Sequence, residues 1–208
     1  VEDEATERYT DRAATEATAA VVEAEAALDE ATLIAASMSA ERGADVARAG
    51  GPTPDPASRA RVQAAVAALA GPDGLAVDAP VVVVAGGTPA AHVPDALAPS
   101  TTLAVAGDPV VVEAVEAEAP RQGVTVAGAA AYAVAAVPVR TLADDVITVA
   151  GVVVVARPLD DAFLARRVAT DSAPLGLSLV TRDAVVASSG RATPRDDGIV
   201  DAARRLID

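Results

Sequence analysis

The sequence of 208 residues contains no cysteine, no tryptophan and no lysine. Without cysteine, the chain forms no disulfide and has no thiolate for nucleophilic catalysis. Aromatic residues account for only 1% of the chain, which leaves no row of aromatic side chains on which nucleobases could stack. A folded core must therefore consist mainly of alanine, valine and leucine, which suits closely packed helices and valine-rich strands.

Positive charges are few, because 16 arginines stand against 30 aspartates and glutamates, for a formal net charge of −14. A surface of this sign repels phosphate backbones, so we expect no nucleic-acid partner. Hydrophobic residues make up 52% of the chain, which is enough apolar surface to build a core. The composition therefore predicts a folded, acidic protein.

Long hydrophobic runs are also missing. A long uncharged stretch, residues 123–139, is interrupted by Gly128 and Pro138. A membrane-spanning helix needs about 20 consecutive apolar residues. We therefore expect two short strands in this stretch.

The first part of the chain reads as helix. Residues 1–48 are rich in alanine and glutamate and contain no proline, which predicts one long helix. Its small apolar residues follow a heptad with two positions, namely Ala14, Val21, Leu28 and Ala35 at the first and Ala17, Ala24, Ala31 and Met38 at the second. This heptad seam predicts either a dimer interface or the face on which the rest of the chain packs. A second helix is expected over residues 57–70, after a break rich in glycine and proline.

From residue 75 onward the pattern changes to short apolar runs. We expect strands over residues 79–85, 88–94, 101–107, 123–128, 131–140 and 147–157. A helix capped by Asp108 follows the third of these runs, a helix beginning near Asp160 follows the last, and a hairpin turning at Arg182 and Asp183 comes next. A short helix over residues 197–207 closes the chain.

This order predicts an α+β fold, in which a long N-terminal helix precedes an antiparallel sheet with flanking helices. The alternative is a doubly wound α/β enzyme domain, because residues 103–128 could form a strand, a helix and a parallel strand. That alternative lacks the G-x-G-x-x-G fingerprint.

The stretches "AYAVAAVPVR", "VITVAGVVVVARPLDDAFL" and "GLSLVTRDAVVASSG" resemble the extracytoplasmic PAS-like sensor domains known as Cache or PDC domains, which occur in bacterial sensor histidine kinases and chemoreceptors. The matching positions are Tyr132, Pro138, Val139, Gly151, Leu159, Asp160, Ser188 and Ser189. A long helix before the sheet is also typical of the family. The resemblance implies a helical segment over residues 1–70, a PAS-like sensor core over residues 75–190 and a C-terminal helix over residues 191–208.

The resemblance further implies a non-catalytic sensor domain of a membrane-bound two-component receptor, in the periplasm or outside the cell. Membrane spans would flank the sequence, a small molecule of unknown class would be the ligand, and the N-terminal helix would form a homodimer. An alternative is a structural dimerisation module whose sheet binds only protein.

Candidate site residues are few. Tyr132, Arg140 and Arg157 lie on or beside the two central predicted strands, where the two guanidinium groups could hold a carboxylate ligand. Alternatively, both arginines end their strands and pair with solvent or with nearby aspartates (Asp144, Asp145, Asp160 and Asp161). His92 is the single histidine and has no metal-ligand or triad spacing around it, so we expect a surface or turn residue. We expect no cofactor, no metal ion and no catalytic residue in this domain.

Overall fold

The structure, a computed structural model, describes residues 2–127, 130–169, 177–180 and 185–189. The chain forms two compact units. The first comprises Val1–Thr125 and Ala133–Arg157, and the second comprises Val126–Tyr132 and Pro158–Asp208.

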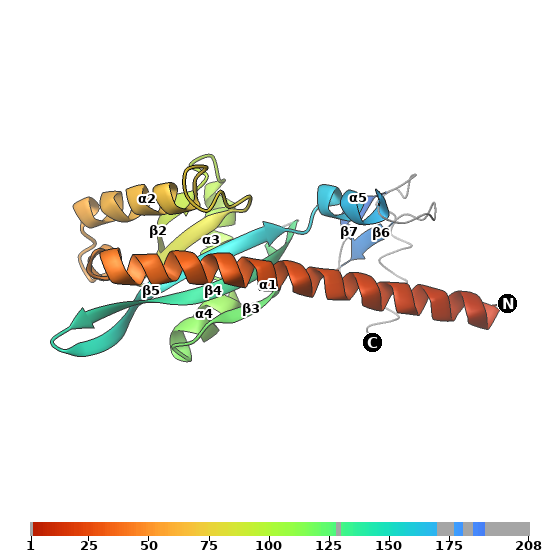
Figure 1. The fold of residues 1–208 in the computed structure, drawn as a ribbon, viewed down its shortest axis with the longest axis horizontal. Helices are drawn as coiled ribbons and strands as arrows, with labels where there is room; N and C mark the ends of the chain where they lie inside the picture. Colours follow the sequence, from red (N-terminus) through yellow and green to blue (C-terminus); the bar gives the residue numbers. More distant parts are fainter. Residues whose placement is uncertain (1, 128–129, 170–176, 181–184, 190–208) are drawn as a thin grey trace. The chain divides into compact units, whose positions relative to one another are not determined.

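Two helices open the first unit, as predicted. Helix α1 spans Glu2–Ala49 and helix α2 spans Pro56–Ala70, and they lie side by side in Figure 1. The carboxylate of Asp55 caps α2, because it accepts hydrogen bonds from the backbone N–H groups of Ala57 and Ser58, both at 3.1 Å. The helix therefore begins where proline supplies its first residue, which needs no hydrogen bond from its nitrogen.

A five-stranded antiparallel sheet forms the centre of this unit, with the strand order β2-β1-β5-β4-β3. The strands are β1 (Val81–Ala85), β2 (Thr88–Val93), β3 (Arg121–Ala127), β4 (Ala130–Ala143) and β5 (Val146–Pro158). Strand β1 pairs antiparallel with both β2 and β5, and Val81 lies opposite Val155. The α+β prediction is therefore confirmed, and the doubly wound alternative is wrong because it requires parallel strands.

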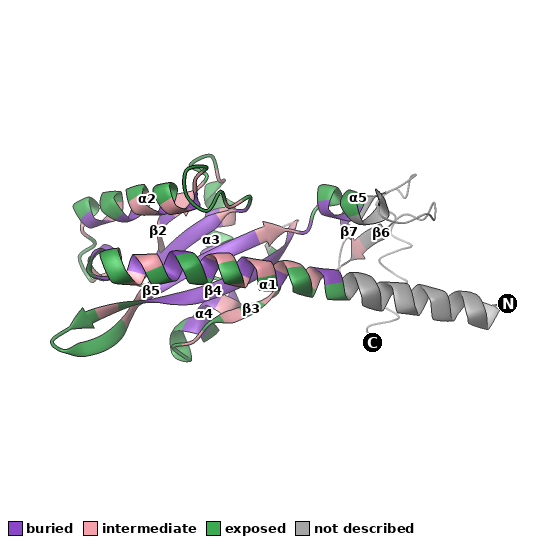
Figure 2. Ribbon diagram, in the orientation of Figure 1, coloured by how far each residue is buried: buried purple, intermediate pink, exposed green. Residues whose placement is uncertain are grey.

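The two faces of the sheet pack against different helices. Alternate residues of a strand point to opposite faces, so Val81 and Val83 lie on the face that packs against Ile34 and Met38 of α1 and Val66 of α2. This core is fully buried, as the purple colour of the central strands in Figure 2 indicates. Each buried valine contributes about 1.5–3 kcal/mol relative to an exposed one.

The opposite face meets two short helices, α3 (Pro99–Ala106) and α4 (Pro109–Glu116). Val82 and Val84 point to this face and are almost completely buried, as are Val105 of α3 and Val111 of α4. The cap predicted at Asp108 is confirmed, because its carboxylate accepts a 2.9 Å hydrogen bond from the Val110 N–H.

The predicted strand over residues 101–107 is wrong, because these residues belong to α3 and its C-terminal cap. Pro99 begins the helix and Gly107 ends it, with the Gly107 N–H donating to the carbonyl of Leu103 at 3.0 Å. A short apolar run has no periodicity that separates a strand from a buried helix. Pro99 before the run and Gly107 at its end are the residues that indicate a helix.

From Ala24 onward, most of the heptad seam is buried within the chain. Ala24, Ala31 and Met38 of its second position are almost completely buried, and the latter two belong to the core beneath the sheet. This part of the seam is therefore the face on which the rest of the chain packs. Val21 is about half exposed instead.

The second unit contains helix α5 (Asp161–Ala169) and a hairpin of β6 (Leu177–Val180) and β7 (Val185–Ser189). The predicted start of α5 is confirmed, since the Asp160 carboxylate accepts a 2.8 Å hydrogen bond from the Phe163 N–H. Strands β6 and β7 pair antiparallel, as predicted. The predicted turn at Arg182 and Asp183 and the predicted helix over 197–207 lie outside the described residues.

Candidate functional site

A cavity of about 500 Å³ lies between the sheet and the helices α3 and α4. We call it the valine cavity. It is lined by Val84, Gly86, Gly87, Ala106, Gly107, Val111, Val112, Val115, Glu116, Val149, Ala150 and Gly151. Its volume is within the range of small-molecule sites, and its wall is mostly apolar, as such sites usually are.

Glu116 is the one titratable residue in the wall of the valine cavity. The remaining lining side chains are those of valine and alanine, and four further positions are glycine. This wall offers hydrophobic contact and exposed backbone groups but no arginine. The cavity therefore favours an uncharged, largely apolar molecule over a carboxylate.

Two glycines in the cavity wall lie against the C-terminal end of α1 and the residue that follows it. A Cβ atom at Gly151 would approach the Val84 carbonyl oxygen to 2.5 Å and Cγ1 of Val46 to 2.7 Å. A Cβ atom at Gly86 would approach the carbonyl oxygen of Gly50, just after α1, to 2.1 Å. Such distances exclude any side chain, so the wall of the cavity is a single backbone layer with α1 behind it.

Arg140 connects α1 to the chain just after helix α4. Its backbone N–H donates a 2.9 Å hydrogen bond to Oγ of Ser39 on α1. Its Nη2 donates a 2.7 Å hydrogen bond to the carbonyl of Glu118, two residues beyond the end of α4. A movement of the C-terminal end of α4 would therefore act on β4 and α1 through one residue.

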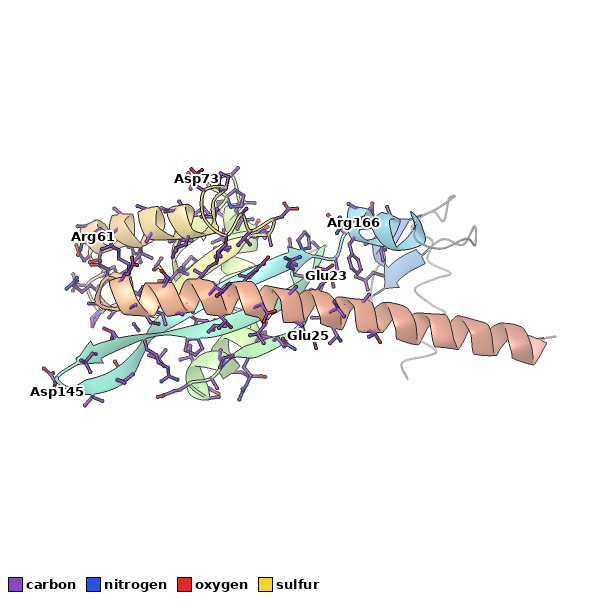
Figure 3. The ribbon with its side chains drawn as sticks, viewed as in Figure 1. Glu23, Glu25, Arg61, Asp73, Asp145 and Arg166 are labelled. Carbon is purple, nitrogen blue, oxygen red and sulfur yellow. The ribbon has the colours of Figure 1, made fainter. Side chains whose placement is uncertain are left out.

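Arg157 ends strand β5 and binds helix α1 by two ion pairs. Its Nη1 lies 3.0 Å from the carboxylate of Glu23, and its Nη2 binds the carboxylate of Glu30; Glu23 is labelled in Figure 3. Burial lowers the pKa of Arg157, but the hydrogen bonds and charges of Glu30 and Glu23 raise that pKa by more. The arginine is thus a fixed cation that joins a strand to a helix.

The predicted trio of ligand-binding residues does not meet in the valine cavity. Tyr132 is buried on β4 and belongs to the second unit, whereas Arg140 and Arg157 belong to the first. The guanidinium group of Arg140 binds the Glu118 carbonyl, and that of Arg157 binds the carboxylates of Glu23 and Glu30.

Asp144, Asp145 and His92 occupy a turn and a strand of the sheet. Asp144 and Asp145 form the turn between β4 and β5, and both have positive φ angles of 50° and 62°, as in a type I′ hairpin turn. His92 is half-buried on β2, where the side chain of Gln63 on α2 binds its backbone N–H at 3.0 Å and its carbonyl at 2.8 Å.

A polar cluster fixes the junction of α1 and α2. The buried carboxylate of Asp45 accepts hydrogen bonds from Arg61 at 2.9 Å and from Arg48 at 2.7 Å, and Oγ of Ser58 lies 3.3 Å away. The hydrogen bonds and charges of Arg61 and Arg48 outweigh burial and hold the pKa of Asp45 far below its ordinary value of 3.8. No local sequence pattern predicts this cluster, because its residues come together only where α1 and α2 meet.

Comparison with known proteins adds no family, since no protein-family model matches the chain and no curated protein matches it. Within the described ranges, none of the helices combines the length and apolar character that crossing a bilayer requires. The described residues also contain no group of three or more histidine, aspartate or glutamate side chains arranged to hold a metal ion. The resemblance to Cache domains therefore stays a prediction from its motifs.

Proposed function

We propose that this chain is a non-catalytic sensor domain of a membrane-bound two-component receptor, in the periplasm or outside the cell, and that a small apolar molecule in the valine cavity is its signal. The observation that carries the proposal is the direct packing of α1 behind Gly86 and Gly151, which form part of the cavity wall. The motif resemblance and the α+β fold support the class of protein.

The geometry supports a mechanical relay from the cavity to α1. A molecule in the cavity would press on Val111, Val112 and Val115 of α4 and on the glycines of the opposite wall. Displacement of α4 would pull on the bond between Arg140 and Glu118, and displacement of the wall would press on Val46 of α1. Both movements reach the same helix.

The relay requires only a modest difference in binding. A ligand shifts a two-state equilibrium by the ratio of its affinities for the two states, and typical coupling free energies are about 1–3 kcal/mol. A helix that moves by a small step against the sheet is a common form of such a transition. Dimerisation through the N-terminal helix is part of the proposal, and the long helix would carry the shift toward a membrane span.

A small group attached covalently in the valine cavity tests the proposal. The chain has no native cysteine, so one engineered thiol is a unique attachment point. Val112→Cys places that thiol in the cavity wall, on a residue that is 50% exposed and so reachable. Modification with benzyl methanethiosulfonate should change amide hydrogen exchange over residues 39–49 of α1. The same modification of Glu113→Cys, on the same helix but outside the cavity wall, is the matched control.

The comparison of methyl and benzyl adducts sharpens the experiment, since both carry the same disulfide and differ in size. Exchange in α1 should change with the benzyl adduct at position 112 more than with the methyl adduct. The four adducts are the methyl and benzyl adducts at positions 112 and 113. The relay would be rejected if the benzyl adduct at position 112 slowed exchange in α4 while all four adducts gave equal exchange in α1.

A further inference from the structure

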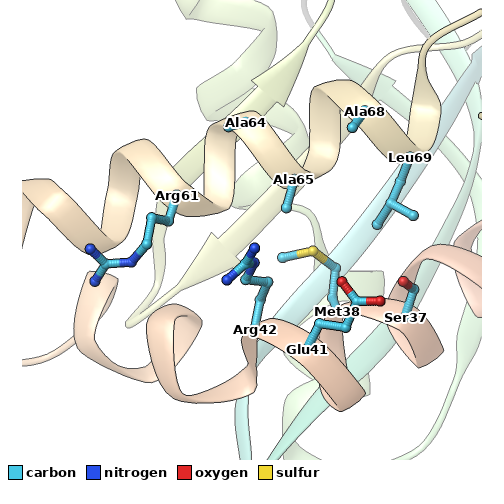
Figure 4. A pocket seen from close by; sticks show the side chains of 9 residues that line it. All are labelled: Ser37, Met38, Glu41, Arg42, Arg61, Ala64, Ala65, Ala68 and Leu69. Atoms are coloured by element: carbon cyan, nitrogen blue, oxygen red, sulfur yellow. The ribbon is translucent and has the colours of Figure 1, made fainter. Parts of the chain in front are cut away.

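The cleft between α1 and α2 is held by ion pairs within the chain (Figure 4). Its wall carries charges of both signs, with Arg42 and Arg61 beside Glu41. Both arginines pair with the buried carboxylate of Asp45, so each already has a counter-charge. An unpaired surface of the first unit lies instead at one edge of its sheet.

The two edges of the five-stranded sheet differ in what covers them. Strand β2 forms one edge, and helices α2 and α3 lie against it. The side chain of Gln63 on α2 accepts a 3.0 Å hydrogen bond from the His92 N–H and donates a 2.8 Å hydrogen bond to the His92 carbonyl. Pro89 and the irregular register between Val83 and Val84 also interrupt this edge. The edge at β2 is therefore closed to a further strand.

Strand β3 forms the opposite edge and has none of these devices. Its seven residues, Arg121–Ala127, contain no proline. Among the described residues, no side chain and no segment outside the sheet forms a hydrogen bond with its backbone. A strand in this position presents a row of unpaired N–H and C=O groups, on which another strand can pair. We call residues 121–127 the β3 edge.

The side chains of the β3 edge suit a neighbouring strand. Val124 is 51% exposed and Val126 is 47% exposed, and they share one face of the sheet because alternate residues of a strand do so. Each cross-strand pair of such β-branched side chains contributes about 0.2–1 kcal/mol. Arg121 is the only charged residue of the strand. A second strand would therefore gain side-chain contacts as well as backbone hydrogen bonds.

The charge distribution favours a second copy of this chain as the occupant. With a net charge of −14 each, two copies repel each other wherever their carboxylates face. Residues 119–143, which contain β3 and all of the neighbouring strand β4, include no aspartate or glutamate, and no other stretch of the chain without these residues is as long. Two copies can therefore approach at the β3 edge with little repulsion.

We propose that two copies of the chain pair through their β3 edges, antiparallel and about a two-fold axis, so that their two sheets become one continuous sheet. A two-fold axis lets both copies use the same surface. Antiparallel pairing keeps the Arg121 side chains of the two copies at opposite ends of the joint, whereas parallel pairing sets them side by side. Pairing about Thr125 puts Val124 of one copy opposite Val126 of the other. The joint uses no residue of the valine cavity, so it does not depend on the proposed sensor function.

Sedimentation equilibrium of the whole chain measures this pairing. A joint of one strand pair is a small interface, below about 1,200 Å², and such interfaces are weak, so the measurements extend to about 1 mM protein. The average mass should rise with concentration from the 20.5 kDa of one chain to at least twice that value. Added salt should strengthen the pairing, because it screens the remaining repulsion between carboxylates such as those of Glu25 and Glu118.

A charge exchange at Val124 tests where the joint lies. Val124→Glu and Val124→Lys should each weaken pairing by about tenfold or more, because two like charges then lie close together across the joint. An equimolar mixture of the two variants should restore pairing, which also shows that both variants are folded. Val146→Glu is the matched control, since Val146 is a similarly exposed valine on β5, away from the edge, and it should leave pairing unchanged.

Leu33→Glu separates this joint from pairing through the N-terminal helix, because Leu33 is exposed on α1. This variant should leave pairing through the β3 edge unchanged. The proposal would be overturned by a single-chain mass at every concentration, by equal losses in Val124→Glu and Val146→Glu, or by a mixture of Val124→Glu and Val124→Lys that stays monomeric. Loss of pairing in Leu33→Glu with none in Val124→Glu would also overturn it.

Discussion

The backbone N–H of Arg140 on β4 donates a 2.9 Å hydrogen bond to Oγ of Ser39 on α1, and Ser39 in turn donates a 2.7 Å hydrogen bond to the carbonyl of Ala35. The long helix is therefore bonded to the sheet by a side chain as well as packed on it. Because the guanidinium of the same Arg140 holds the Glu118 carbonyl, this residue contacts both layers that cover the sheet.

Removal of the Ser39 hydroxyl should weaken the attachment of α1 to the sheet. We expect Ser39→Ala to lower the free energy of unfolding by about 0.5–1.5 kcal/mol, the usual net value of one hydrogen bond, measured by urea denaturation. Ser37→Ala, two residues earlier on the same helix, is the matched control. An equal loss of unfolding free energy in both variants would show that the hydrogen bond of Ser39 to Arg140 does not stabilise the attachment of α1.

Asp45 should make the stability of the protein depend on acid pH. Its pKa is lower in the folded chain than its ordinary value of 3.8, so the folded state holds fewer protons and this stabilisation is fully present above about pH 5. It is lost as the pH falls through 3.8 toward the lower folded pKa. Asp45→Asn should cost about 1–3 kcal/mol at pH 7 and should flatten the fall in stability below pH 4.

The measurement for Asp45 is urea denaturation at a series of pH values from 7 to 3. Asp73→Asn is a suitable control, because Asp73 is exposed beyond the end of α2 (Figure 3). Parallel pH curves for the wild type and Asp45→Asn would contradict the proposed source of the pH dependence.

Gly151 should tolerate no side chain, because the methyl group of alanine would meet Val84 and Val46 at 2.5–2.7 Å. We expect Gly151→Ala to destabilise the fold by about 1–3 kcal/mol, as overpacking of a core does, and to increase hydrogen exchange in the last turns of α1. Gly107→Ala also alters the cavity wall, but its methyl group would come no closer than 3.4 Å to the Leu103 carbonyl. A larger loss in Gly107→Ala than in Gly151→Ala would refute this packing argument.

Arg157 and Glu30 should show a measurable coupling. The pair is only about one-quarter exposed, so solvent screens it less than an ordinary surface ion pair. A double-mutant cycle with Arg157→Gln and Glu30→Gln should give an interaction free energy of about 0.5–1.5 kcal/mol. Glu25 on α1 is exposed (Figure 3), and a cycle with Glu25→Gln should give a value near zero; similar values in both cycles would contradict the assigned contact.

The local features of this fold are readable from the sequence because they depend on neighbouring residues. The cap at Asp108 and the start of a helix near Asp160 each follow from a side chain and the few residues beside it. The strand predicted over residues 101–107 is wrong because the apolar run has no period of its own, and Pro99 and Gly107 define a helix there instead.

The candidate sites are less predictable, because they depend on which elements meet. Arg140 and Arg157 are visible in the sequence as arginines near strand ends, but their partners lie 22 residues away for Arg140 and 134 and 127 residues away for Arg157. Glycines such as Gly86, Gly107 and Gly151 can mark positions where another part of the backbone comes close. No local pattern indicates that α1 lies behind two of them.

The most direct test of the relay is a distance measurement between α1 and the sheet. Spin labels on Leu33→Cys of α1 and Leu142→Cys of β4 report this distance by double electron–electron resonance, since both side chains are exposed and the chain has no other cysteine. Filling the cavity wall with Val112→Trp should shift the distance distribution or add a second peak, and Glu113→Trp should not. Distributions that superimpose in the unfilled, Val112→Trp and Glu113→Trp proteins would contradict the claim that occupancy of the valine cavity moves α1.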